Sequence, residues 1–272
     1  MTASAPATAF AATDGDAYER QMGRWSRRLA PLLVGFAGIG GAVRVLDVGC
    51  GTGNLGACLA RSPEMVGVHG VDVCAAYVEH ARHRNSDVRL VFEVGDARAL
   101  PFPDASFDHA LSMLALQFVS QADVAVREMR RVTRRGGIVA AATWDTRGGL
   151  MAYRMIFDAA ALLVRGGHQQ RASACTRPMS RPGELARAWR EAGLTDVLQD
   201  AVTIRMDFAS FADYWTPAEG KDGPVAQFVG TLDREARAVL RDAVKSVYLD
   251  GEDDGPRSYA ATAWVVKGRV PN

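Results

Sequence analysis

The sequence predicts an α/β protein in which helices cover both faces of a mostly parallel sheet. Between residues 43 and 143, short apolar runs alternate with segments that are long enough to form helices. Repeated strand-helix units of this kind build a parallel sheet, because each helix carries the chain back to the starting edge of the sheet. Four glycines within residues 49–56 follow the first apolar run, where the chain must turn tightly into a helix.

Seven apolar segments have the length and composition of strands. Five of them lie between residues 43 and 144, and the sixth alternates apolar and polar side chains as a half-buried strand does. The predicted strands span residues 43–48, 66–72, 88–94, 107–114, 137–144, 201–208 and 259–268.

The clearest helix lies within residues 118–137. Its apolar side chains recur at spacings of three and four, and its arginines fall on the opposite side. Ser120 is the expected N-cap, and the glycine pair at 136–137 is the expected end of the helix. We interpret the arginines as a solvated face that complements the helix dipole, rather than as a phosphate site. The apolar stripe consists of Phe118, Ala122, Ala125, Met129 and Val132.

The second half of the chain predicts further helices over 151–164 and 181–194. About fifty residues separate the last two predicted strands. A hairpin loop is far shorter, so this insertion is expected to form helices of its own. The sequence therefore predicts one large domain. Its expected parts are a disordered tail (1–17), a helical segment (18–42) and a domain (43–272) with cap insertions at about 146–181 and 207–256.

The composition argues against several classes of partner. Lys and Arg number 32 against 31 Asp and Glu, so no strong overall field attracts nucleic acid or an anionic membrane. No stretch approaches the roughly 18 apolar residues that span a bilayer. We therefore expect a small-molecule substrate, no nucleic acid and no membrane span.

The four cysteines are scattered and form no C-x-x-C pair. No histidine lies near them at the spacing of metal ligands, so neither a zinc site nor a disulfide framework is predicted. The first sixteen residues lack the basic and apolar regions of a signal peptide. These features predict a cytoplasmic protein that exists as a monomer or a homodimer.

The stretch "LDVGCGTGNLG" contains two overlapping glycine patterns. Gly51, Gly53 and Gly56 form G-x-G-x-x-G, which is typical of a dinucleotide site, whereas Asp47 opens D-x-G-x-G-x-G through Gly49, Gly51 and Gly53. Asp47 favours the second pattern, because a carboxylate at the strand end would repel a pyrophosphate. S-adenosylmethionine has no phosphate and carries an ammonium and a sulfonium group. The alternative is that Asp47 only caps the turn.

Asp72 ends the second predicted strand, 21 positions after Gly51. A carboxylate at this place can accept hydrogen bonds from both ribose hydroxyls, and dinucleotides and S-adenosylmethionine share that feature. Asp72 therefore indicates a nucleoside without identifying it. The alternative is that Asp72 is the N-cap of the helix that follows.

Several motifs together resemble the class I S-adenosylmethionine-dependent methyltransferases. These motifs are "VLDVGCGTG", "GVD", "VGDARALPFPDASFD" and "REMRRVTRRGG", and they are most similar to the group of the ubiquinone and menaquinone biosynthesis C-methyltransferases. The resemblance covers about residues 18–145. It implies a Rossmann-like, seven-stranded, mostly parallel sheet with an antiparallel last strand, helices on both faces and a helical cap insertion.

The resemblance also implies cofactor-binding residues. Asp96 and Ala97 would meet the adenine edge, and Val73 would lie against the adenine face. Residues 18–42 would close over the cofactor, with Tyr18 and Arg24 reaching the methionine carboxylate. The glycine-rich loop would contribute Asp47, Gly49, Cys50, Gly51 and Gly53, and the second strand would contribute Asp72.

The end of the fourth strand would form the wall beside the methyl group. Met113 and Gln117 are the candidates there, although Met113 is equally expected in the core. Gln117 stands where relatives often have a histidine, which puts an acid-base role in doubt. No carboxylate pair suitable for magnesium follows the fourth strand, so we expect no metal.

The expected reaction is an in-line displacement that moves a methyl group to a small, apolar or aromatic acceptor and leaves S-adenosylhomocysteine. Alignment of the two reactants can by itself supply much of the rate acceleration, so the reaction does not require a catalytic side chain. Weak candidates for an acid-base role are Gln117, Tyr153, His168 and Tyr214. Two alternatives remain, namely a binding protein of this fold that transfers no methyl group and a nicotinamide-dependent oxidoreductase.

Overall fold

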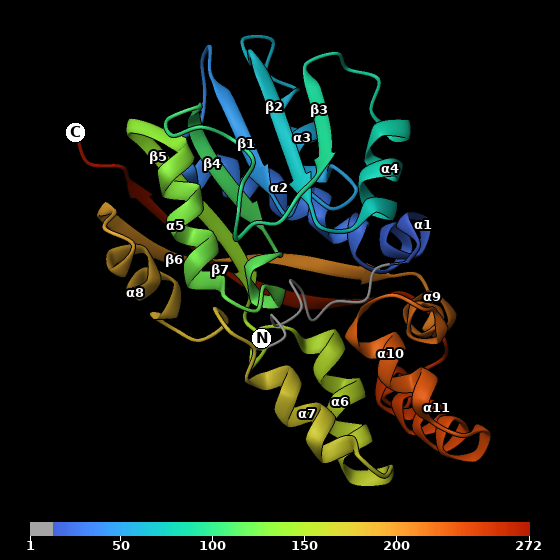
Figure 1. Cartoon of the computed structure of the whole chain (residues 1–272). Coiled ribbons are helices and arrows are strands. Elements are labelled where there is room, and N and C mark those ends of the chain that lie inside the picture. Colours follow the sequence, from blue (N-terminus) through green and yellow to red (C-terminus); the bar gives the residue numbers. More distant parts are fainter. Residues whose placement is uncertain (1–12) are drawn as a thin grey trace, which may run out of the picture.

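In the computed structural model, which describes residues 13–272, seven strands form one sheet in the order β3-β2-β1-β4-β5-β7-β6 (Figure 1). The pairings among β1 to β5 are parallel, whereas β7 runs antiparallel to β5 and to β6. The α/β fold with an antiparallel last strand is thus confirmed. The strands are β1 (Arg44–Val48), β2 (Gly67–Asp72), β3 (Leu90–Val94), β4 (Phe107–Met113), β5 (Thr133–Trp144), β6 (Thr195–Phe208) and β7 (Arg257–Arg269).

Helices cover both faces of this sheet. One face packs against α2 (Arg24–Ala37) and α3 (Asn54–Leu59), and the other face packs against α5 (Ala122–Val132) and α8 (Glu184–Glu191). The central strands bury nearly every side chain, because both faces are covered. Between β2 and β3, α4 (Ala75–Arg84) packs on the edge of the sheet.

A group of helices gathers beyond one end of the sheet, in the lower part of Figure 1. Neither α7 nor α10 was predicted as a separate helix. Buried aromatic rings hold this group against the end of β6, with Phe208 and Tyr214 at 5.1 Å between centroids. The helices are α6 (Met151–Leu163), α7 (Gly167–Cys175), α9 (Phe211–Trp215), η3 (Thr216–Glu219), α10 (Gly223–Thr231) and α11 (Arg234–Leu249).

The ends of α5 differ from the prediction. Gln121, not Ser120, occupies the N-cap, and the helix ends at Val132 rather than at the glycine pair. Strand β5 begins directly at Thr133, which pairs with Phe107 of β4 and donates its hydroxyl to a carbonyl of the helix's last turn. Strand pairing therefore ends this helix four residues before the first glycine.

The predicted disordered tail extended to residue 17, and its first twelve residues lie outside the described part. Residues 13–17 differ from the prediction, because α1 (Gly15–Tyr18) begins there. The buried Asp222 carboxylate accepts hydrogen bonds from the Thr13 amide and hydroxyl and from the Asp14 amide, at 2.6–3.0 Å. Thr13 and Asp14, where the described residues begin, are thus tied to the start of α10. Within residues 13–272, no helix has the length and apolar character needed to cross a bilayer.

Candidate functional site

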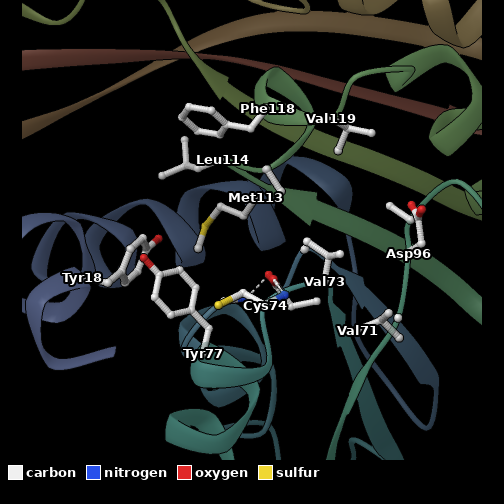
Figure 2. Close-up of a pocket in the computed structure, with 16 residues that line it drawn as sticks. Tyr18, Val71, Val73, Cys74, Tyr77, Asp96, Met113, Leu114, Phe118 and Val119 are labelled. Atoms are coloured by element: carbon white, nitrogen blue, oxygen red, sulfur yellow. Dashed lines mark hydrogen bonds between the residues drawn. The ribbon is translucent and has the colours of Figure 1, made fainter. Parts of the chain in front are cut away.

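The first pocket lies at the carboxyl ends of β1, β2 and β4, where the glycine-rich loop turns into α3. In Figure 2, Tyr18 and Tyr77 lie side by side at one end of this pocket and Asp96 lies at the other, with Met113 and Val73 between them. The pocket is therefore elongated, with polar groups at both ends and apolar walls between. We call it the strand-end pocket.

Two glycines shape the floor of the strand-end pocket. Gly49 has a φ of 73°, and a Cβ atom there would lie 2.2 Å from the Cβ of Ala115, so only glycine fits. Gly51 has a φ of 52° and faces open space, and its amide donates to Asp72 at 2.9 Å. The loop thus leaves room for a ligand against its backbone.

Asp72 connects the glycine loop with the start of α4. One carboxylate oxygen accepts from the Gly51 amide, and the other accepts from the Cys74 amide at 2.9 Å. Cys74, rather than Asp72, is the N-cap residue of α4. Burial raises the pKa of the Asp72 carboxyl, although its backbone hydrogen bonds lower it.

Asp47 lies at the end of β1 and is only 1% exposed. Neither carboxylate oxygen has a hydrogen-bond partner within the described residues. Burial, followed by the charge of Asp72, raises the pKa of Asp47 to about 7. The side chain is behind the pocket wall, not on it, and it acts electrostatically on Asp72 and Tyr18, which do line the pocket. An unpaired buried carboxylate is expensive, so a nearby cation would stabilise it.

The far end of the pocket contains Asp96 and Ala97, as the motif predicted. The Asp96 carboxylate forms an ion pair with Arg98 at 2.8 Å, and this hydrogen-bonded pair lowers the pKa of Asp96. Val73 is 41% exposed and lines the pocket, so an apolar surface is available to a flat ring. Met113 also lines the pocket, whereas Cys50 and Gly53 support the loop from outside it.

Tyr18 brings the N-terminal segment into the pocket. Its ring lies 5.0 Å from that of Tyr77, and its hydroxyl is 3.3 Å from the Ser26 hydroxyl. Burial raises the pKa of Tyr18 to about 12.

Glu19 anchors the same segment, a contact that the sequence analysis missed. Its carboxylate accepts from Thr52 and Asn54 of the glycine loop and pairs with Arg84 at 2.6 Å. A Cβ atom at Gly23 would meet this carboxylate at 2.4 Å, so the π-helical turn η1 (Glu19–Gly23) requires glycine there. The segment is therefore fastened directly over the loop.

Arg24 is not brought to the strand-end pocket. Its guanidinium bonds both oxygens of Asp213 at 2.9 and 3.0 Å and lies 4.3 Å from the Trp25 ring. Arg24 was expected to contact a methionine carboxylate. In the structure its guanidinium instead binds the carboxylate of Asp213, which belongs to the cap insertion. Trp25 and Leu29 are buried and fix α2 to the sheet.

A second, apolar pocket adjoins the first. Tyr18, Leu114 and Phe118 line both pockets, so the two adjoin at these side chains. Leu114 has a φ of 62°, which is unusual for a branched residue and aims its side chain at this junction. The empty space inside this pocket, including its open mouth, is about 690 Å³. We call it the cap pocket, because α6, the end of α7 and α10 supply most of the other walls.

The four candidates for acid-base chemistry are separated by the fold. Gln117 and Tyr153 line the cap pocket, but the Gln117 side-chain oxygen accepts from the Trp144 amide at 3.1 Å. Tyr214 is buried behind it and donates its hydroxyl to the Ala152 carbonyl. His168 is exposed on α7. Gln117 thus belongs to the cap pocket and not to the wall of the strand-end pocket where it was predicted.

Comparison with known proteins identifies the fold. A family model described as "Methyltransferase domain" matches residues 46–141, and this range contains the glycine loop and three more of the lining segments. The chain superposes on phosphoethanolamine N-methyltransferase 2 of Haemonchus contortus, crystallised with S-adenosyl-L-methionine, with a TM-score of 0.59 and 18% identity over 95% of this chain and 57% of that one. The chain has the class I methyltransferase fold.

Sequence relatives agree over the same region. A malonyl-[acyl-carrier protein] O-methyltransferase of Erwinia pyrifoliae is 41% identical over 125 residues, which are 46% of this chain and 45% of that protein. The chain thus matches less than half the length of this curated relative. The matched domain and the fold both agree with the methyltransferase motifs found in the sequence. The finer likeness to the ubiquinone and menaquinone group stays a prediction.

Proposed function

We propose that this chain is an S-adenosylmethionine-dependent methyltransferase whose acceptor is a small apolar or aromatic molecule. The observation that carries this proposal is that the two pockets adjoin and share the side chains of Tyr18, Leu114 and Phe118. A cofactor in the strand-end pocket and an acceptor in the cap pocket would meet at these side chains.

The residues of the strand-end pocket fit this cofactor. Gly51 leaves open space above the loop, and the unpaired Asp47 carboxylate favours a positively charged ligand over a diphosphate. Asp72 would hold the ribose, and Asp96 with Ala97 would meet the adenine edge. When bound, S-adenosylmethionine supplies a methyl group on a positively charged sulfur. Tyr18 and Glu19 would keep the N-terminal segment closed over it.

The residues at the junction would act by position. Tyr18, Leu114 and Phe118 would exclude water and hold the acceptor in line with the bond that breaks, and alignment of this kind is worth effective molarities of roughly 10⁵ M or more. The apolar walls of the cap pocket, including Trp144, Leu150 and Phe157, favour an apolar or aromatic body.

Isothermal titration tests the cofactor assignment. We expect the protein to bind S-adenosylmethionine and S-adenosylhomocysteine and to show no comparable affinity for NAD. Preferential binding of NAD would reject the proposal and favour an oxidoreductase.

A second function is favoured by one comparison. A solved structure named as the [4+2]-cyclase SpnF has a TM-score of 0.55 and 24% identity to this chain, covering 98% of it and 88% of that chain. The fold is therefore compatible with a protein that transfers no methyl group. Incubation of the protein with methyl-labelled cofactor and a small-molecule extract separates the two functions, because only a methyltransferase moves label to another compound.

A further inference from the structure

The cap pocket contains two guanidinium groups in an otherwise apolar wall, Arg154 and Arg177. Arg154 already has partners, because it pairs with Asp158 at 3.1 Å, a carboxylate that it shares with Arg171, and also donates to a backbone carbonyl. Arg177 has no ion-pair or hydrogen-bond partner for its side chain within residues 13–272. Residues 1–12 contain no Asp or Glu that could form an ion pair with it.

Arg177 is held in place by a ring rather than by a charge. Its guanidinium carbon lies 4.8 Å from the centroid of Phe118, and this stacking leaves the N–H donors at the edge of the group free. Phe118 lines both pockets, so Arg177 lies beside the junction where an acceptor would meet the cofactor. Burial lowers the pKa of Arg177, with no compensating carboxylate.

The cap pocket also lacks a side chain suited to remove a proton. None of the described residues that line it is Asp, Glu, His or Cys, and residues 1–12 contain none of these types. Its two tyrosines, Tyr18 and Tyr153, have their pKa values raised by burial, so both stay protonated at neutral pH. An acceptor that arrives as a neutral alcohol or a charged amine would find no base here.

We propose that the acceptor is a carboxylate on an apolar body, that Arg177 binds the carboxylate, and that the product is a methyl ester. This inference rests on the proposed function. A planar guanidinium matches two carboxylate oxygens better than any other side chain does. A carboxylate is also fully ionised at neutral pH, so it needs no base.

The reaction balances without a proton transfer. A carboxylate oxygen forms the new bond to the methyl carbon while the bond from that carbon to sulfur breaks, and the electron pair remains on sulfur. An anion and a cation thus become two neutral products, a change that an apolar pocket favours because both charges disappear.

Binding tests the role of Arg177 without turnover. Three probes share one apolar body, namely 4-phenylbutanoate, 4-phenylbutanol and 4-phenylbutylamine, and each is titrated into the full chain loaded with S-adenosylhomocysteine. We expect the carboxylate to bind best and Arg177→Gln to weaken it about tenfold or more, with partial recovery in Arg177→Lys. Arg181→Gln is the matched control, because Arg181 is exposed and lines neither pocket. Unchanged thermal unfolding and S-adenosylhomocysteine affinity identify a folded variant.

The chemistry of the product tests the ester. The chain is incubated with methyl-labelled S-adenosylmethionine and a small-molecule extract, and the products are treated with alkali, which releases methanol from a methyl ester but not from an ether or an N-methyl group. Label released as methanol supports the inference. Label in alkali-stable products, or equal probe affinity in wild type and Arg177→Gln, overturns the inference and leaves the methyltransferase proposal intact. Label that never leaves the cofactor overturns both.

Discussion

The strand-end pocket and the cap pocket differ in how the chain builds them. The strand-end pocket takes its walls from the ends of neighbouring strands and the loops that follow them, together with Tyr18, so its residues come in short motifs within about one hundred positions. The cap pocket combines the N-terminal segment with α6, the end of α7 and α10, which lie up to about two hundred positions apart. The first is set by sheet topology, whereas the second depends on long-range packing.

The two pockets are therefore suited to different ligands: the strand-end pocket to one shared by proteins of this fold, and the cap pocket to one specific to this chain. The strand-end pocket is lined by the carboxylates of Asp72 and Asp96, whose positions follow from the sheet, and any sequence with this topology can present such groups at the same edge. The cap pocket has apolar walls and one unpaired guanidinium, and its shape can change with the insertions alone. The following variants test whether the two pockets respond independently, in order of decreasing expected effect.

The largest effect is expected at Asp47. Its pKa in the folded protein is about 7, above that of an unfolded Asp, so the folded state holds a proton that the unfolded state has lost. The stability contributed by this group is therefore complete below about pH 4 and is lost as the pH rises to 7, by about 4 kcal/mol in all. Asp47→Asn removes this loss. Urea unfolding at several pH values measures it, and parallel pH profiles for the two proteins would contradict the assignment.

Asp72→Ala comes next. The substitution leaves the amides of Gly51 and Cys74 without their acceptor and removes the expected ribose contact, so S-adenosylmethionine affinity should fall by about 2 kcal/mol. Binding of 4-phenylbutanoate in the cap pocket should change little. Asp123→Ala, an exposed carboxylate on α5, is the control in the same calorimetric titrations. An equal loss in both pockets would mean that they are not independent.

Glu19→Gln tests the N-terminal segment, whose Tyr18 lines both pockets. The variant keeps the shape but loses the charge that pairs with Arg27 and Arg84. We expect about 1–2 kcal/mol weaker binding in both pockets, because Tyr18 lines both and depends on this anchor. Faster proteolytic cleavage near residue 19 should accompany the loss. Intact affinity with unchanged proteolysis would show that the segment is held by other contacts.

Val73→Ala should have the smallest effect. The side chain is 41% exposed without a ligand, and an adenine ring would cover it. Removing two methyl groups from such a contact costs about 0.5–1 kcal/mol of cofactor affinity and should leave protein stability and the cap pocket unchanged. Comparison of S-adenosylhomocysteine titrations for the two proteins measures this loss.

Much of the fold could be predicted from the sequence, because the central strands are buried on both faces and appear as continuous apolar runs. All seven strands lie where the apolar segments predicted them, and the differences are confined to their ends. The helix end at Val132 could not be predicted from composition, since it depends on the pairing of Thr133 with a distant strand. The contacts of Thr13 and Asp14 with Asp222 have the same long-range origin.

The strand-end pocket was more predictable than the cap pocket, because contacts between residues remote in sequence leave no local motif. The structure brings Tyr18, Asp72, Asp96 and Met113 together in one pocket, as the motifs implied. Arg24 and Gln117 were placed wrongly, because their partners, Asp213 and the Trp144 amide, are remote in sequence. Arg177 belongs to no motif. Its only signal was an arginine in a predicted cap insertion, which by itself does not differ from a solvated side chain.

The backbone at Leu114 has a consequence for engineering. A branched residue in the left-handed region costs on the order of 1 kcal/mol, and glycine or asparagine would relieve that cost. Attempts to raise thermal stability would therefore select substitutions at this position. A glycine or asparagine at position 114 would also remove the leucine side chain that lies between the two pockets. Thermal stability and turnover are therefore expected to trade off at this residue.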